Sequence, residues 1–150
     1  MKNSLDNLIV KSIQKVIGEG PHQLHEPLFF GKEIQYLKNT INQNFVSTAG
    51  MYVNKFENKI KGYTKAKFAI AVVNGTQAIY ISLVASGVNK KEEVLVPALT
   101  FAGTVNAISY LGAEPHFVDS QIENFGINCL KLENYLSKIV KFRGKKCINK

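Results

Sequence analysis

Four consecutive residues, Asn74-Gly75-Thr76-Gln77, stand where an apolar segment gives way to a helical pattern. Residues 68–73 are apolar and predict a strand, and the spacing over 76–86 predicts a helix. Backbone N–H groups at a helix start have no partner inside the helix, and the helix dipole leaves partial positive charge there. The junction therefore predicts a site for an anion such as phosphate. Because asparagine is also an ordinary helix cap, a purely structural role is the alternative.

The common nucleotide motifs are absent around this junction. No GxGxxG follows the predicted strand, and no GKS or GKT opens the predicted helix. A dinucleotide site and a P-loop are therefore disfavoured, and a smaller phosphate ligand remains.

The elements that would position this junction alternate between strand and helix. Gly87 is the predicted stop of the first helix; a strand at 94–96 ends at Pro97, a helix at 102–111 stops at Gly112, and a strand at 115–118 ends at Asp119. This order predicts an α/β fold. Ligands of such sheets lie beyond the carboxyl ends of the strands, so we expect residues 74–76, 97–101 and Asp119 to gather at one edge.

Helices are predicted on either side of this α/β segment. Ser4 is the expected cap of an amphipathic helix at 5–17, and further helices are expected at 32–44 and at 52–60, with Gly62 as the stop. A loop of small residues fills 45–50. One more amphipathic helix is predicted at 130–140, and the basic stretch 138–150 is interpreted as a solvated helix face and loop.

Composition sets the class of protein. The chain has 150 residues, 45% of them hydrophobic, and a formal net charge of +8. No apolar run is long enough to span a membrane and no signal peptide is evident, so a cytoplasmic protein is expected. Arg143 is the single arginine, and scattered lysines lack the planar fork that reads bases, so nucleic acid is not expected as a partner. Cys129 and Cys147 are interpreted as reduced thiols.

The three histidines show no metal-ligand spacing. His22, His25 and His116 are far from one another and from the cysteines in the sequence. We interpret them as structural residues and expect no metal site.

The order of several segments resembles a known family. NGTQA followed by VLVPALTFAGTVNAISYLGAEPHFVD resembles the DegT/DnrJ/EryC1/StrS family of pyridoxal-phosphate sugar aminotransferases. The preceding LHEPLFFGKEIQYLKNTINQNFVSTAGMYVNKFENKI is similar to members that act on nucleotide-linked 4-keto amino sugars, especially in legionaminic-type pathways. The resemblance covers residues 24–128.

This resemblance implies a fold and a division of the chain. The fold would be the N-terminal part of the large domain of a fold-type I pyridoxal-phosphate transferase, a three-layer α/β/α domain preceded by helices. Residues 1–23 would form an N-terminal amphipathic helix and linker. Residues 24–150 would form the incomplete large domain.

The resemblance also implies roles for individual residues. Gly75, Thr76 and Gln77 match the segment that holds the cofactor phosphate, through backbone N–H groups and a threonine hydroxyl. Phe101 matches the aromatic residue that lies against the pyridine ring; packing in the core is its alternative role. Asp119 is expected to bond nearby backbone and not the pyridinium nitrogen.

A second set of residues would lie near the substrate. Thr48, Gly50 and Tyr52 match the stretch that family members place beside the sugar, where small residues leave room for a bulky nucleotide sugar. An ordinary surface loop is the alternative.

The activity implied by the resemblance is transfer of an amino group, from a donor such as glutamate, to a keto nucleotide sugar for surface-polysaccharide or amino-sugar synthesis. The full-length enzyme would be a homodimer that uses pyridoxal 5′-phosphate. Family members carry the lysine that binds the cofactor covalently, and its acidic partner, in a region expected beyond Lys150. No catalytic residue is therefore assigned within 1–150, and the chain as given is expected to be an inactive fragment.

Two alternatives stay open from the sequence. Some relatives use the same cofactor for sugar dehydration, with another residue in place of the lysine. The chain would otherwise be a non-catalytic, truncated product that acts by association through the apolar helix at 5–17.

Overall fold

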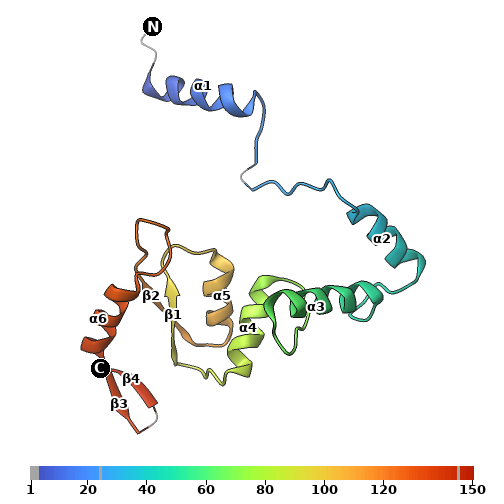
Figure 1. Ribbon diagram of the computed structural model, residues 1–150. Coiled ribbons are helices and arrows are strands. Elements are labelled where there is room, and N and C mark those ends of the chain that lie inside the picture. The colour runs from blue at the N-terminus through green and yellow to red at the C-terminus, as the bar shows by residue number, and fades with distance from the viewer. Residues whose placement is uncertain (1–3, 24, 145) are drawn as a thin grey trace. The chain divides into compact units, whose positions relative to one another are not determined.

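The computed structural model describes residues 4–23, 25–144 and 146–150. It divides into two compact units, Met1–Lys59 and Ile60–Lys150, and Figure 1 labels their helices and strands. The helices are α1 (Leu5–Ile17), α2 (Glu33–Asn42), α3 (Met51–Thr64), α4 (Gly75–Ala85), α5 (Ala102–Tyr110) and α6 (Cys129–Ile139). The strands are β1 (Glu93–Pro97), β2 (Glu114–Val118), β3 (Val140–Arg143) and β4 (Lys146–Asn149). The boundary predicted between residues 23 and 24 stays a prediction.

The first unit contains α1, α2 and the start of α3. Helix α1 has the predicted bounds and ends at Gly18, whose φ of +89° is in the region that favours glycine. Ser4 is the N-cap residue of α1, as predicted, but its side chain makes no hydrogen bond to the first turn. The apolar face of α1 is exposed; Val16, for example, is 84% exposed.

Helix α3 continues past the glycine at which it was predicted to stop. Gly62 lies inside α3, which ends at Thr64. The hydroxyl of Thr64 donates to the carbonyl of Ile60 at 2.8 Å, and the chain leaves the helix at Lys65, whose φ is +59°. The prediction was wrong because Gly62 does not take up the left-handed conformation with which glycine ends helices.

A β1–α5–β2 crossover forms the centre of the second unit. Strands β1 and β2 pair in parallel from Glu93↔Glu114 to Pro97↔Val118. Val96 and Ile108 are each 1% exposed and Ala113 is 5% exposed, and they form a core packed by partly buried neighbours: Leu83, Val88, Val94, Val105 and Leu111. Gly87 and Gly112, with φ of +80° and +70°, end α4 and α5 as predicted.

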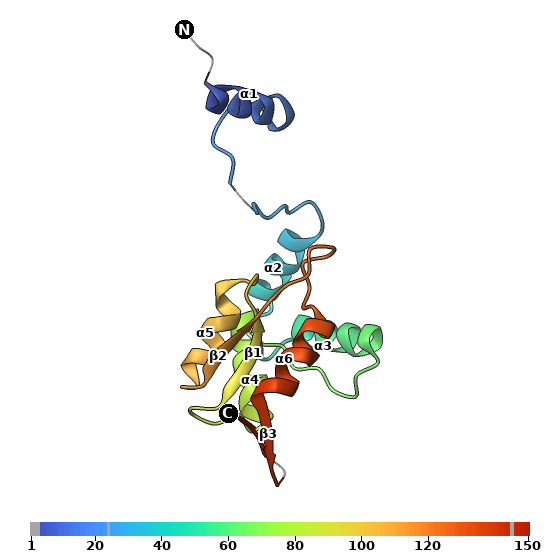
Figure 2. The ribbon, with the colours of Figure 1, turned by 90° about the vertical axis from the view of Figure 1, so that its left-hand side faces the viewer.

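Helices cover both faces of this strand pair. Helix α5 lies against the face that carries Val94 and Val96. Because side chains alternate along a strand, Leu95 and His116, which are in register, lie on the opposite face from Val94 and Val96. On that face His116 contacts Tyr135 of α6. Figures 1 and 2 show α5 and α6 on opposite sides of β1 and β2. The second unit therefore has the α/β/α layering that the sequence predicted.

Two predictions of secondary structure were wrong in this unit. Residues 68–73 form no strand, because the ladders among the described residues pair β1 with β2 and β3 with β4. The tail after Ile139 is not a helix face and loop. It forms an antiparallel hairpin in which β3 pairs with β4 from Val140↔Asn149 to Arg143↔Lys146.

Candidate functional site

The start of α4 offers two free backbone donors. Asn74 is the N-cap of the helix, and its side-chain oxygen accepts from the N–H of Gln77 at 2.9 Å. Gly75 and Thr76 are the first two residues of α4, and N–H groups at these positions have no partner within a helix. An anion at this end would therefore meet the N–H groups of Gly75 and Thr76, whereas that of Gln77 is already bonded to Asn74.

Gly103 brings two predicted site residues to one point. This residue is buried in the first turn of α5. A Cβ built on it would lie 2.4 Å from Oγ1 of Thr76 and 3.0 Å from Cδ1 and Cε1 of Phe101. The Thr76 hydroxyl and the Phe101 ring therefore both border the position that a Gly103 side chain would occupy. Gly103 was not predicted as a site residue; the signal that could have found it is a glycine two residues after the aromatic Phe101.

The ring of Phe101 is available to a ligand. The Phe101 side chain is 82% exposed, so it does not have the alternative role of packing in the core. It directly precedes α5, and its carbonyl accepts from the N–H of Thr104 at 3.0 Å. The backbone around the ring is therefore held by the helix start while the ring itself stays accessible.

Asp119 bonds local backbone, as predicted. Its side chain accepts from the N–H of Ser120 at 2.9 Å, and its other oxygen lies 3.7 Å from the ammonium of Lys131. Asp119 follows β2 and Pro97 ends β1, and the two strand ends are in register through Pro97↔Val118. The ends of β1 and β2 therefore lie side by side as expected, whereas the gathering of residues 74–76 at the same edge stays a prediction.

The residues predicted to contact substrate lie in the first unit. Gly50 and Tyr52 line an open, mainly apolar cavity of about 310 Å³, and Thr48 is not among its lining residues. The Tyr52 hydroxyl accepts from the side-chain amide of Asn39 at 3.2 Å. The Tyr52 ring centroid is 4.9 Å from that of Tyr36, so Tyr52 is fixed on two sides.

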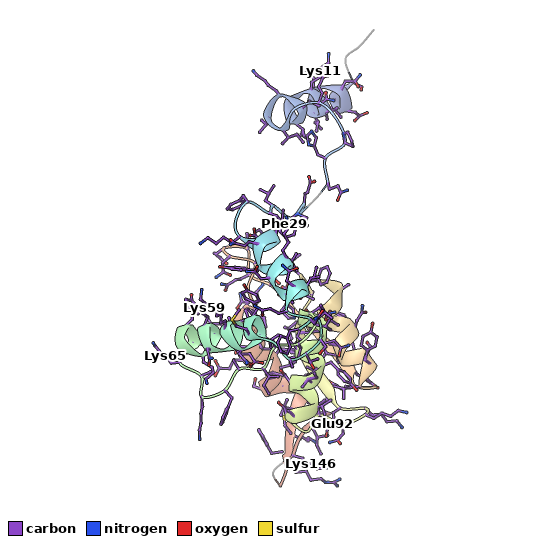
Figure 3. The ribbon with its side chains drawn as sticks, turned by 90° about the vertical axis from the view of Figure 1, so that its right-hand side faces the viewer. Lys11, Phe29, Lys59, Lys65, Glu92 and Lys146 are labelled. Carbon is purple, nitrogen blue, oxygen red and sulfur yellow. The ribbon has the colours of Figure 1, made fainter. Side chains whose placement is uncertain are left out.

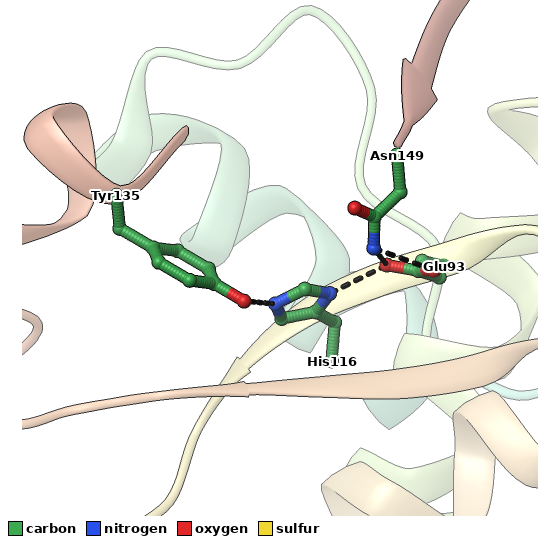
Figure 4. Close-up of polar contacts among 4 residues, drawn as sticks. All are labelled: Glu93, His116, Tyr135 and Asn149. Carbon is green, nitrogen blue, oxygen red and sulfur yellow. Dashed lines mark hydrogen bonds and ion pairs between the residues drawn. The ribbon is translucent and has the colours of Figure 1, made fainter. Parts of the chain in front are cut away.

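A cluster of four polar residues lies at the other end of β1 and β2 (Figure 4). Nδ1 of His116 is 2.5 Å from the Glu93 carboxylate, and Nε2 is 2.9 Å from the Tyr135 hydroxyl. The amide of Asn149 donates to both oxygens of Glu93 at 3.0 Å. The structural interpretation of His116 is confirmed, and His22 likewise bonds the carbonyl of Gly18 at 3.1 Å.

The described ranges contain neither a metal site nor a membrane-spanning helix. No group of three His, Cys, Asp or Glu side chains there could hold a metal ion. No helix within them is long and apolar enough to cross a membrane. Figure 3 shows the side chains over the ribbon, where Lys59, Lys65 and Lys146 mark some of the positive charge.

Comparison with known proteins identifies the family. The model of the DegT/DnrJ/EryC1/StrS aminotransferase family matches residues 30–142. The chain belongs to this family. Among curated relatives of this family, GDP-perosamine synthase of Escherichia coli O157:H7 is 36% identical over 118 residues, which cover 79% of the chain and 32% of the relative. The 3-oxo-glucose-6-phosphate:glutamate aminotransferase of Bacillus subtilis is 33% identical, with coverage of 77% and 27%.

Solved structures of the family give the same result for the fold. Spr1654 from Streptococcus pneumoniae, assigned as a sugar aminotransferase and solved in its PLP form, matches with a TM-score of 0.63 and 26% identity. The match covers 75% of the chain and 29% of Spr1654. The chain therefore spans about a third of the length of the family members it matches. The predicted fold class, the N-terminal part of a fold-type I transferase, is confirmed; the legionaminic-type subgroup stays a prediction.

Proposed function

We propose that the chain forms the phosphate-binding and ring-binding part of a pyridoxal 5′-phosphate site, in an enzyme that transfers an amino group to a keto nucleotide sugar. One observation carries the proposal. The Thr76 hydroxyl and the Phe101 ring, from segments separated in the sequence, border the same point beside Gly103. The family and the PLP form of Spr1654 support the identity of the cofactor.

The residues at this point fit the chemistry of the cofactor. A phosphate ester needs several donors, and the N–H groups of Gly75 and Thr76 with the Thr76 hydroxyl supply three. The partial positive charge at the start of α4 adds to their attraction. The exposed Phe101 ring offers a flat apolar surface for a flat heterocycle.

Gln77 has a conditional part in this proposal. Its N–H donates to Asn74 at 2.9 Å, so a phosphate receives a bond from Gln77 only when the Asn74 side chain moves aside. The phosphate cradle is therefore defined as the N–H groups of Gly75 and Thr76 with the Thr76 hydroxyl. The Asn74 side chain controls access to a further donor, the N–H of Gln77.

Pyridoxal phosphate, when bound, supplies an electron sink for amino-group transfer. The described residues of the chain bind and orient it. Gly75 and Thr76 anchor the phosphate end, and Phe101 limits the tilt of the ring.

The substrate side of the proposal rests on the first unit. Gly50 and Tyr52 line a cavity in which a small residue and a fixed aromatic ring leave an apolar surface. We assign this cavity to the nucleotide sugar, with Thr48 in the adjoining loop. Glutamate as the amino donor, and a homodimer as the functional assembly, complete the proposal; the name of the Bacillus relative supports glutamate.

The test measures binding of pyridoxamine 5′-phosphate and of pyridoxamine, which lacks the phosphate. Neither ligand can react covalently with lysines, so the fluorescence change reports the cradle alone. Thr76→Val keeps the side-chain shape but removes the hydroxyl, and we expect about tenfold weaker binding of the phosphorylated ligand only. Phe101→Ala should weaken binding of both ligands, by about three- to tenfold.

Matched variants away from the cradle provide the controls. Thr64 lies at the end of α3, and Phe125 is a loop residue that is 65% exposed. Thr64→Val and Phe125→Ala should leave both affinities unchanged. The proposal would be contradicted if Thr76→Val lost affinity equally for both ligands, or if neither Thr76→Val nor Phe101→Ala lost affinity.

A further inference from the structure

The cluster of Glu93, His116, Tyr135 and Asn149 joins four elements that are separate in the sequence. Glu93 comes from β1, His116 from β2, Tyr135 from α6 and Asn149 from β4. Figure 4 shows the Tyr135 hydroxyl and the Glu93 carboxylate on the two sides of the His116 ring, with the Asn149 amide directed at the carboxylate. The proposed cofactor site uses none of these residues.

Helix α6 and the β3–β4 hairpin are joined to each other by hydrogen bonds and form one body. The backbone N–H of Lys150 donates to the carbonyl of Ile139 at 2.8 Å, and its ammonium donates to the carbonyl of Lys138 at 2.7 Å. The end of the hairpin is therefore tied to the end of α6. Tyr135 and Asn149 are the two points at which this body reaches the cluster.

Both points depend on Glu93. Asn149 bonds the carboxylate directly, and Tyr135 bonds it through His116. A neutral His116 donates a hydrogen bond from Nδ1 to the carboxylate and accepts one from the Tyr135 hydroxyl at Nε2, whereas a protonated ring donates from both nitrogens. The ring therefore keeps both bonds in either charge state while Glu93 is ionised. A protonated Glu93 still has an acceptor oxygen, but without the charge its hydrogen bonds are weaker.

We propose that the ionised Glu93 carboxylate holds α6 and the β3–β4 hairpin on the β1–β2 sheet, and that acid releases them. Protonation of Glu93 removes the charge that draws the His116 N–H and the Asn149 amide together. The hairpin and α6 then separate from the sheet as one body. The separation leaves β1–α5–β2 intact, because its core lies on the opposite face.

The direction of the pKa shift agrees with this geometry. The hydrogen bond from His116, and after it that from Asn149, lowers the pKa of Glu93 below its ordinary value of 4.5. A carboxyl whose pKa is lower in the folded state adds stability above its ordinary pKa, and that stability is lost as the pH falls through the lowered pKa. The hydrogen bonds to the Glu93 carboxylate are therefore at full strength near neutral pH and are weakened in acid.

Other charged groups of the described residues lie near the cluster, among them Glu114, which stands in register with Glu93 on β2. Lys138 of α6 and Lys150 after β4 are tied to each other through the contact described above. Asp119 and Lys131 form a second contact between the end of β2 and α6, but their charged atoms are 3.7 Å apart and their side chains are 76% and 70% exposed. An ion pair so exposed contributes little, so the acid response should follow Glu93.

Hydrogen exchange of the full 150-residue chain tests the proposal, with protection factors corrected for the intrinsic rate at each pH. We expect Glu93→Gln at neutral pH to lower protection of α6 and the hairpin on the order of tenfold, because glutamine keeps one acceptor oxygen and no charge. The amides of β1 and α5 should change less. Wild-type α6 and hairpin should lose the same protection in acid.

Glu114→Gln is the matched control. Glu114 stands in register with Glu93 on the neighbouring strand but takes no part in the cluster, and its variant should match the wild type. Equal effects of the two variants, or none in Glu93→Gln, would overturn the proposal. If Glu93→Gln does not fold, Tyr135→Phe is the second variant, because it removes the hydrogen bond to His116 and keeps the aromatic ring. Tyr135→Phe should lower the protection of both α6 and the hairpin. Unchanged protection would overturn the proposal.

Discussion

Replacing Asn74 separates two roles of the helix start. The Asn74 side chain bonds the N–H of Gln77 at 2.9 Å and so caps α4. Asn74→Ala should cost about 1 kcal/mol in the unfolding free energy of the ligand-free protein, the usual value of an N-cap. The same change frees a third N–H beside those of Gly75 and Thr76.

The freed N–H should strengthen phosphate binding. In the wild type a phosphate competes with Asn74 for the N–H of Gln77, whereas in Asn74→Ala it meets no competitor. A hydrogen bond to a charged group contributes about 1.5 kcal/mol, so pyridoxamine 5′-phosphate should bind about tenfold more tightly to the variant. Binding of unphosphorylated pyridoxamine should not change.

Fluorescence titration gives the affinities, and urea unfolding gives the stability. Asn74→Ser is the control, because serine can restore the cap, and both quantities should return towards the wild type. Binding of the phosphorylated ligand that is tenfold weaker in Asn74→Ala would refute this reasoning, since it would mean that the Asn74 side chain itself contacts the phosphate.

Four further substitutions test the fold by urea unfolding. Ile108→Ala should cost about 2–5 kcal/mol, because Ile108 is 1% exposed in the core, whereas Ile122→Ala, at an 86% exposed position, should cost less than about 0.5 kcal/mol. Gly112→Ala should destabilise by about 1 kcal/mol, since φ is +70° and the new Cβ would lie 3.1 Å from Cγ of Lys90. Gly62→Ala should stabilise α3 by about 0.5–1 kcal/mol, because Gly62 is in the helix interior with nothing within 4 Å of the added Cβ. Equal effects at Gly112 and Gly62, or a similar cost at both isoleucines, would contradict these assignments.

Local patterns were sufficient where an element and its partner are adjacent in the sequence. The strands at 94–96 and 115–118 and the helix between them were predicted nearly to the residue, and β1 and β2 pair with each other. Gly87 and Gly112 marked helix ends because both adopt positive φ. Such signals need no knowledge of distant segments.

Distant contacts decided the cases that the sequence could not resolve. Residues 68–73 have a strand's composition, but composition supplies no pairing partner. Gly103 has no chemistry of its own, and its importance comes from the approach of Thr76 and Phe101. His116 was predicted to be structural, but its bonds to Glu93 and Tyr135 depend on the register of β1 with β2 and on the placement of α6.

The β1–α5–β2 crossover also has a consequence for synthesis of the protein. Its parallel strands are joined by a single short helix, and the core residues Val96, Ile108 and Ala113 all lie within one contiguous stretch of chain. A nascent polypeptide could therefore close this unit once β2 has left the ribosome, while the hairpin is still inside the exit tunnel. The loop that must close to pair β1 with β2 is short, which keeps its entropic cost small, so the part of the chain that holds Phe101 and Gly103 would be shaped before the hairpin.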